Sequence, residues 1–139
     1  MLFPLTSPVL PKHLWLLLAI YFPATVSHFA HNAEFIAYYP NMPDGLSRET
    51  VYLAWLGVTG VGVAGLAAAR IGFEVLGAIL LGAYGALGLD ALAHYTLALC
   101  SEHSLAANLT IGFEAVAGFA LLLAAALLAG RTLARRLSA

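Results

Sequence analysis

Four long apolar runs are the feature that most limits what this chain can fold into. They cover residues 13–39, 49–69, 74–100 and 108–130, with only short connections between them. About 20 apolar residues in a helix cross an ordinary bilayer, so each run is long enough for one span. The mean hydropathy of +0.90 and the charged fraction of 9% agree with this interpretation. The sequence therefore predicts an all-α, polytopic membrane four-helix bundle that forms a single domain over residues 1–139.

The basic residues predict how this integral, multi-pass bundle is oriented. With four spans, five of them fall on one side, namely Lys12, Arg70, Arg131, Arg135 and Arg136. Only Arg48 falls on the other side. Because basic residues are enriched in short cytoplasmic segments, both termini are predicted to be cytoplasmic. Six basic residues in a chain of net charge -1 make no basic patch, so we expect no nucleic-acid partner.

Six ionisable residues interrupt the apolar runs at a similar depth. They are His28, His31 and Glu34 in the first run, Asp90 and His94 in the third, and Glu114 in the fourth. At about 1.5 Å per residue, all of them lie in the outer half of their spans. Steps of three or four residues keep neighbours on one face of a helix. Because ionisable groups are costly in hydrocarbon, we expect them to meet in a polar pocket open toward the outer leaflet.

The predicted pocket has two groups of candidate residues. The catalytic candidates are His31, Glu34, Asp90, His94 and Glu114. The candidates for substrate binding are His28, Glu49, Trp55, Tyr38 and Tyr95. The alternative is a plug, in which these groups only hydrogen-bond to one another and fix the register of the helices.

Histidines and carboxylates in an apolar pocket are suited to general acid/base catalysis on a hydrophobic molecule, because burial and close pairing tune both groups. Such an enzyme needs no cofactor and no metal. Two alternatives stay open. The carboxylates and histidines could hold a metal, or His28 or His31 together with His94 could ligate a haem. The protein could also bind or transport a membrane lipid or hydrophobic small molecule without chemistry. Ionisable residues confined to the outer half favour a pocket over a conduit.

Small residues are frequent in the second and third runs. The glycines are Gly57, Gly60, Gly62 and Gly65 in the second run, and Gly77, Gly82, Gly85 and Gly88 in the third. Small residues let helix backbones approach closely in membranes, so we expect tight packing within the bundle. The same faces would permit a homodimer. Between the first two runs, Ser47 is predicted to cap the second helix, with Glu49 in its first turn.

Several short motifs resemble the EXPERA group, which contains the emopamil-binding sterol isomerases. They are His31-Asn32-Ala33-Glu34 with Tyr38-Tyr39, Glu49-Thr50-Val51 with Trp55 and Gly57, the stretch from Arg70 to Asp90 with Gly85 and Gly88, and Glu102-His103. The resemblance implies a cavity reached from the membrane. It also implies an isomerase that moves a double bond through a carbocation, or a related terpenoid cyclisation.

The resemblance also implies roles for individual residues. His31 and Glu34 would be the acid/base pair, and Glu49 would be the carboxylate that opens the second helix. Asp90 would be the polar group of the third helix, and Glu114 would stand where the isomerases have an amide. The chain departs from the family pattern in the spacing of His31 and Glu34, which is three rather than four. It also has only small residues where the family has a tryptophan in the last span.

Overall fold

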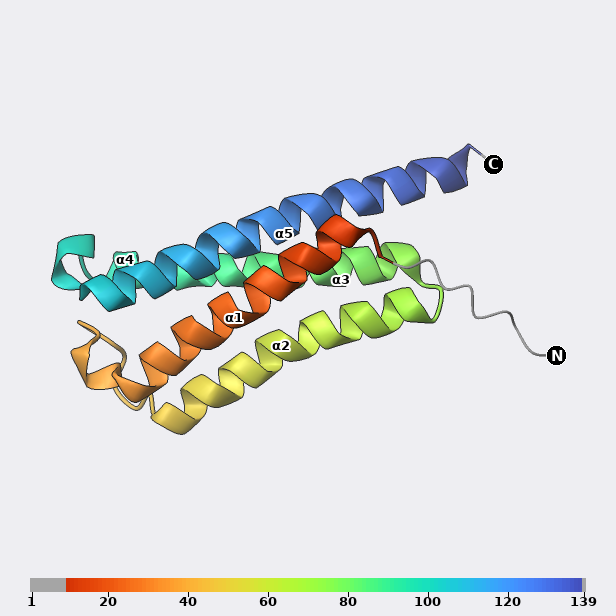
Figure 1. Ribbon diagram of the computed structural model, residues 1–139. Helices are drawn as coiled ribbons and strands as arrows, with labels where there is room; N and C mark the ends of the chain where they lie inside the picture. Colours follow the sequence, from red (N-terminus) through yellow and green to blue (C-terminus); the bar gives the residue numbers. More distant parts are fainter. Residues whose placement is uncertain (1–9, 139) are drawn as a thin grey trace.

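The computed structural model describes residues 10–138 and is all-helical over that range (Figure 1). The long helices are α1 (Lys12–Glu34), α2 (Arg48–Arg70), α3 (Glu74–Leu87) and α5 (Leu105–Leu137). The chain continues from α3 through a 3₁₀ segment (Gly88–Ala93) into the short α4 (His94–Leu97). Single 3₁₀ turns lie at Ile36–Tyr38 and Cys100–Glu102. The described chain thus contains four helical spans, each long and apolar enough to cross a membrane, which confirms the predicted four-helix bundle.

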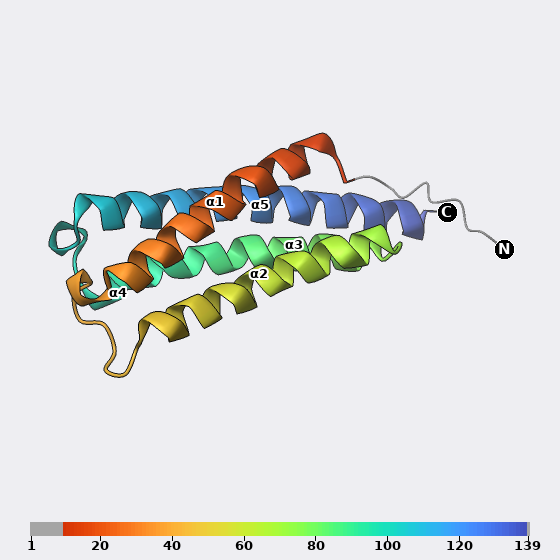
Figure 2. The same ribbon diagram turned by 60° about the horizontal axis from the view of Figure 1, so that its bottom comes forward.

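The bundle has two distinct ends. Figures 1 and 2 show the start of α1, the end of α2, the start of α3 and the end of α5 at one end, which we call the terminal end. The opposite end, called the loop end, carries residues 35–47 and 98–104. Five basic residues therefore gather at the terminal end, where Arg136 and Glu74 lie 3.7 Å apart as an ion pair between α5 and α3. The prediction that this end is cytoplasmic stays a prediction.

Close packing of α3 against α5 depends on glycine. A Cβ atom on Gly85 would lie 2.6 Å from the Gly118 carbonyl oxygen and 2.8 Å from the Leu122 backbone nitrogen. Gly88, at the start of the 3₁₀ segment, packs in the same way against α1, because a Cβ atom there would lie 2.7 Å from the Tyr21 ring. The expected tight packing is therefore present at these positions. On α2 it is present at Gly62 and Gly65, whereas a Cβ atom on Gly57 or Gly60 would meet nothing within 4 Å, so these two glycines face outward.

The first helix ends earlier than the predicted residue 39. It stops at Glu34, and after one 3₁₀ turn Tyr39 is extended, with φ -85° and ψ 122°. Pro40 explains this conformation, because the ring of a proline disfavours the helical region for the residue before it. Tyr39 therefore folds back toward the bundle instead of continuing the helix, and its side chain is buried.

The last helix is longer than the predicted 108–130 at both ends. Ser104 caps it by accepting a hydrogen bond from the Ala107 backbone N–H at 3.1 Å, so that the helix starts at Leu105. At the other end it continues through Gly130 to Leu137, because arginines propagate helices well and favour the negative C-terminal end of the helix dipole. The predicted cap at Ser47 is confirmed, with a reciprocal pair of hydrogen bonds to Thr50.

The third span ends at Leu97, three residues before the predicted boundary, and it is not one regular helix. The hydrogen-bonding pattern tightens from α-helical to 3₁₀ over Gly88–Ala93 and returns to α-helical in α4. A 3₁₀ helix has three residues per turn instead of 3.6, so the segment rotates the side chains that follow it relative to α3. This rotation decides which polar residues of the span face the bundle interior.

Candidate functional site

One face of α1 carries a buried polar stripe. Tyr21, Thr25, His28 and Asn32 follow one another at steps of four, three and four residues, which places them on the same side of the helix. Their exposed fractions are 0%, 0%, 3% and 8%. The stripe faces the bundle interior, and its loop-end half meets polar residues from α4, α5 and the two loops.

The deepest contact of the stripe joins His28 to Glu114 of α5. The His28 Nε2 atom lies 3.8 Å from the Glu114 Oε2 atom, and the two side chains are 4% and 1% exposed. Within residues 10–138, four polar groups here form no hydrogen bond: both oxygens of Glu114, the Nδ1 atom of His28 and the Thr25 hydroxyl. The Thr25 hydroxyl lies beside the Glu114 carboxyl group without closing to a hydrogen bond. Burying a polar group without a partner costs free energy. This pair is therefore an energetically unfavourable feature of the bundle interior.

His94 of α4 connects this pair to the loop end. Its ring packs edge to face against His28, with 5.2 Å between the centroids. The Asn32 amide nitrogen lies 3.2 Å from His94 Nε2. An amide NH₂ group can only donate, so Nε2 accepts this bond and the neutral ring carries its proton on Nδ1. The His94 ring also packs against Tyr39, with centroids 4.9 Å apart.

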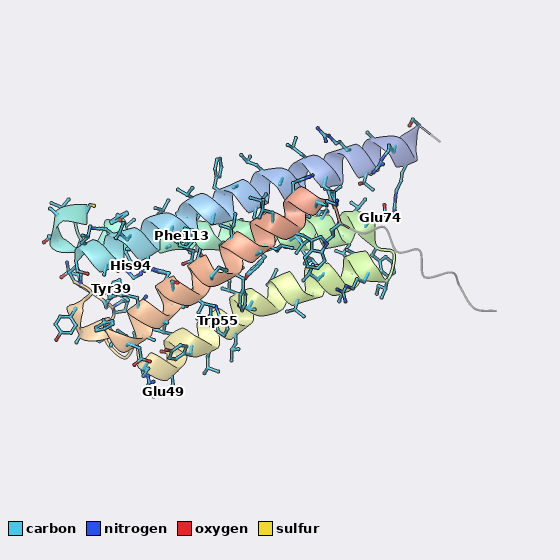
Figure 3. The ribbon with its side chains drawn as sticks, viewed as in Figure 1. Tyr39, Glu49, Trp55, Glu74, His94 and Phe113 are labelled. Carbon is cyan, nitrogen blue, oxygen red and sulfur yellow. The ribbon has the colours of Figure 1, made fainter. Side chains whose placement is uncertain are left out.

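Tyr39 and His103 close the cluster toward the loop end. The Tyr39 hydroxyl and the His31 Nδ1 atom are 2.8 Å apart. The ring of His103 lies 6.1 Å from both Tyr39 and His94, and 5.5 Å from Tyr95. Burial raises the pKa of Tyr39 to about 12, so its hydroxyl keeps its proton over the whole neutral range. Figure 3 shows Tyr39 and His94 together at the loop end, far from Glu74 at the terminal end.

Glu34 does not join the cluster. Its Oε1 atom accepts hydrogen bonds of 2.8 Å from the Arg48 Nε atom and from the Tyr52 hydroxyl, and its side chain is 42% exposed. The reason is geometric: two steps of three residues turn a side chain by about 120° around an α-helix, so Glu34 leaves the face that His28 occupies. The structure therefore brings the predicted partners His31 and Glu34 to different neighbours.

Asp90 is also separated from its predicted neighbour. His94 is buried, but Asp90 is exposed. Both belong to the stretch in which the span passes through the 3₁₀ segment. At three residues per turn, a step of four residues separates side chains by about 120° rather than about 40°, so the two do not share a face. Of the five catalytic candidates, the structure places His94 and Glu114 near His28, and it places His31 one contact further out through Tyr39.

The substrate-binding candidates are divided in the same way. His28 lies at the centre of the cluster and Tyr95 at its edge, where its hydroxyl donates to the Asn108 side-chain oxygen at 2.8 Å. Tyr38 is 78% exposed, and Glu49 lies on the outside of the first turn of α2 (Figure 3). Trp55 faces α1, where its ring centroid lies 6.2 Å from that of Phe22.

Sequence reasoning assigns no role to Thr25, Asn32, Tyr39 and His103, although the last three stand in the motifs that resemble the EXPERA group. A signal for the first two was present, because Thr25, His28 and Asn32 repeat at the helical spacing of three and four. No local signal could place Tyr39 and His103, since both are brought in by loops.

The described residues offer little support for a metal or haem. No group of three or more His, Cys, Asp or Glu side chains within residues 10–138 is arranged to hold a metal ion. The rings of His28 and His94 are in edge-to-face contact, which leaves no slot between them for a macrocycle. His31 is engaged by Tyr39 instead of facing His94.

No protein-family model, curated protein or solved structure matches the chain. The similarity to the EXPERA group therefore stays a prediction from short motifs, and functional conclusions depend on the geometry of the cluster.

Proposed function

We propose that this chain is a multi-pass membrane protein that performs general acid/base chemistry on a hydrophobic molecule, with His28 and Glu114 as the working pair. One observation carries the proposal: an imidazole and a carboxyl group approach to 3.8 Å at 4% and 1% exposure, with their other polar atoms unpartnered within the described chain. Catalytic hydrogen bonds are often long before the substrate binds, so a distance of 3.8 Å suits a pair that tightens on a substrate.

The absence of partners distinguishes this pair from a plug. A plug that fixes helix register would satisfy its own members, because an unsatisfied buried polar group costs about 1–3 kcal/mol. His94 behaves in this way, since Asn32 donates to it. The carboxyl group of Glu114 does not, because both of its oxygens lack a partner within residues 10–138. Structural features that cost free energy, such as a buried carboxyl group without a partner, are concentrated at functional sites.

The reaction that fits is the shift of a carbon–carbon double bond. The carboxylic acid of Glu114 would donate its proton to one alkene carbon, forming a C–H bond and leaving a carbocation. A base, either His28 or the Glu114 carboxylate, would then remove a proton from a neighbouring carbon and restore the alkene. Where His28 is the base, its proton would return to Glu114 before the next turnover. One C–H bond forms and one breaks, so no oxidant or cofactor is required. Sterols and terpenoids are the substrate class, as the EXPERA-like motifs imply.

Deuterium incorporation tests this proposal directly. The purified protein in detergent would be incubated in D₂O with a mixture of sterols and terpenes that contain double bonds, and the products examined by mass spectrometry. The acidic proton of Glu114 exchanges for deuterium in D₂O. A turnover by the exchanged protein places one solvent deuterium on carbon, so the wild type should yield singly labelled isomers. Glu114→Gln should yield none, since the amide has no acidic proton to give.

The matched control is Glu74→Gln, which removes a carboxylate from the terminal end of the same bundle. This variant should incorporate label at the wild-type rate. Labelling that persists in Glu114→Gln, or a wild-type protein that labels none of the compounds, would contradict the proposal. A Soret band in the absorption spectrum of the same preparation would instead support the haem alternative.

A further inference from the structure

A second site lies between α1, α2 and α3, closer to the terminal end than the His28–Glu114 pair. It is a cavity of about 380 Å³, which is within the range typical of small-molecule sites. Trp15, Leu18 and Phe22 of α1 form one wall, Thr59 and Leu66 of α2 the other, and Tyr84 of α3 lies between them. We call it the α1–α2 cavity. Trp15 and Phe22 are exposed on the outside of the bundle, so the cavity is reached from the side, where acyl chains would lie.

Two hydroxyl groups in this apolar wall have no partner. The Tyr84 hydroxyl and the Thr59 Oγ1 atom are both buried and form no hydrogen bond within residues 10–138. Tyr84 is 3% exposed, and the Thr59 hydroxyl lies beside its hydroxyl without closing to a hydrogen bond. A buried hydroxyl without a partner is costly, and the cost is recovered when a ligand supplies one. These hydroxyls are therefore the polar contacts that would orient a ligand in the cavity.

The position of Tyr84 is fixed by its surroundings. A Cβ atom on Gly62 would lie 2.6 Å from the Tyr84 ring, so only glycine at this position lets the ring reach between α2 and α3. On its other side, Tyr84 packs edge to face against Tyr21, with centroids 4.6 Å apart. The Tyr21 hydroxyl donates to the Tyr84 carbonyl oxygen at 2.9 Å. The ring is thus held in place before any ligand arrives, which lowers the entropy cost of binding.

We propose that the α1–α2 cavity binds an uncharged, mainly hydrocarbon molecule that carries a single hydroxyl or carbonyl group. The wall contains no charged side chain among the described residues, which disfavours an ionic headgroup. Its two hydroxyls can both donate and accept, so either an alcohol or a carbonyl oxygen is recognised. This site is separate from the acid/base pair, and it would hold its ligand whether or not that pair performs chemistry.

Trp15 provides a direct readout, because it lines the cavity and the protein has only two tryptophans. In a Trp55→Phe background, Trp15 is the sole indole. A dibrominated C20 isoprenoid alcohol would be titrated into the protein in micelles, since bromine quenches indole fluorescence on contact. Saturable quenching is expected. The dibrominated hydrocarbon without the hydroxyl group should bind more weakly, and a dibrominated phosphatidylcholine should quench without saturating.

Two variants remove the hydroxyls and keep the shape of the wall. Tyr84→Phe and Thr59→Val should each weaken the alcohol about fivefold, which corresponds to one hydrogen bond of about 1 kcal/mol. Binding of the hydrocarbon should not change. Gly62→Ala, which displaces the Tyr84 ring, should weaken both probes. These variants remove polar groups or add one methyl, and circular dichroism checks that each stays helical.

The outcomes separate this site from the proposed chemistry. Glu114→Gln should bind the alcohol as the wild type does, even though it fails in the deuterium assay. Quenching that never saturates, an equal response to the phospholipid, or full affinity in both Tyr84→Phe and Thr59→Val would overturn the proposal, because the cavity would then be ordinary lipid-facing surface.

Discussion

Replacing Glu114 by methionine should make the protein more stable, although it removes a buried carboxyl group. Methionine is unbranched and similar in length to glutamate, so it can fill the same space with an apolar chain. The change removes two oxygens that have no partner within residues 10–138. Unsatisfied buried groups cost about 1–3 kcal/mol, and this is the gain expected in the free energy of unfolding.

Little is lost in exchange. The 3.8 Å between Glu114 and His28 exceeds the range of a hydrogen bond, so no formed bond is broken. If the two groups instead acted as a structural ion pair, removing one partner would leave the other charge uncompensated, at a cost of about 3–5 kcal/mol. The functional and the structural interpretation of Glu114 therefore predict changes of opposite sign.

Unfolding by sodium dodecyl sulfate in mixed micelles, followed by circular dichroism, measures this free energy. The matched control is Val116→Met on the same helix, where the side chain is 72% exposed and the change should be close to zero. A loss of about 3 kcal/mol or more in Glu114→Met would refute the reasoning, and the cluster would then be a register-fixing plug. A gain in stability combined with loss of deuterium incorporation is the result that we expect.

Three further outcomes follow from the structure. Gly85→Ala should lower the free energy of unfolding by about 1–3 kcal/mol, because its Cβ atom would meet the backbone of α5. Gly60→Ala should leave it unchanged, since nothing lies within 4 Å of that position. Unfolding in detergent measures both variants. Ser104→Ala should cost about 0.5–2 kcal/mol in the same assay and speed hydrogen exchange at the start of α5, where the cap is lost. Because the folded protein raises the pKa of Tyr39 from 10.0 to about 12, the free energy of unfolding should fall as the pH rises from 10 toward 12. Tyr39→Phe should weaken that dependence by the share of one phenol, and the difference in tyrosinate absorbance between wild type and variant should show that this phenol titrates late.

The fold could be predicted from the sequence because it depends on strong signals. Four apolar runs give four spans, and Ser47 is a cap that can be recognised from its residue type and position. The boundaries were less accurate where a local interaction competes with apolar composition. Pro40 turns Tyr39 away from α1, and the cap at Ser104 starts α5 three residues early. Pro40 and Ser104 are both visible in the sequence. Neither the turn at Pro40 nor the cap at Ser104 changes the hydropathy from which the spans are predicted.

The site was harder to predict because small rotations decide it. Depth along each span placed the polar residues in the same half of the bundle, which holds for His28, His94 and Glu114. The direction in which a side chain faces is a different matter. Glu34 lies two steps of three residues after His28, so its side chain leaves the face of α1 that His28 occupies. Asp90 leaves the face that His94 occupies because the third span is a 3₁₀ helix at that point. A sequence pattern that assumes a regular helix of 3.6 residues per turn cannot detect the second of these effects.

The cavity and the acid/base pair share one structural wall but cannot be one site in this conformation. Tyr21 belongs to the polar stripe of α1, and it is also the residue that packs against Tyr84 in the cavity. Along α1, six residues separate Phe22 in the cavity wall from His28, which is about 9 Å at 1.5 Å per residue. Proton transfer requires hydrogen-bond distance, so a molecule in the cavity can react at Glu114 only if it extends past Tyr21. A Cβ atom on Gly88 would lie 2.7 Å from the Tyr21 ring, so a larger side chain at this position would displace that ring and affect both sites together. Tyr84→Phe and Glu114→Gln, in contrast, affect one site each.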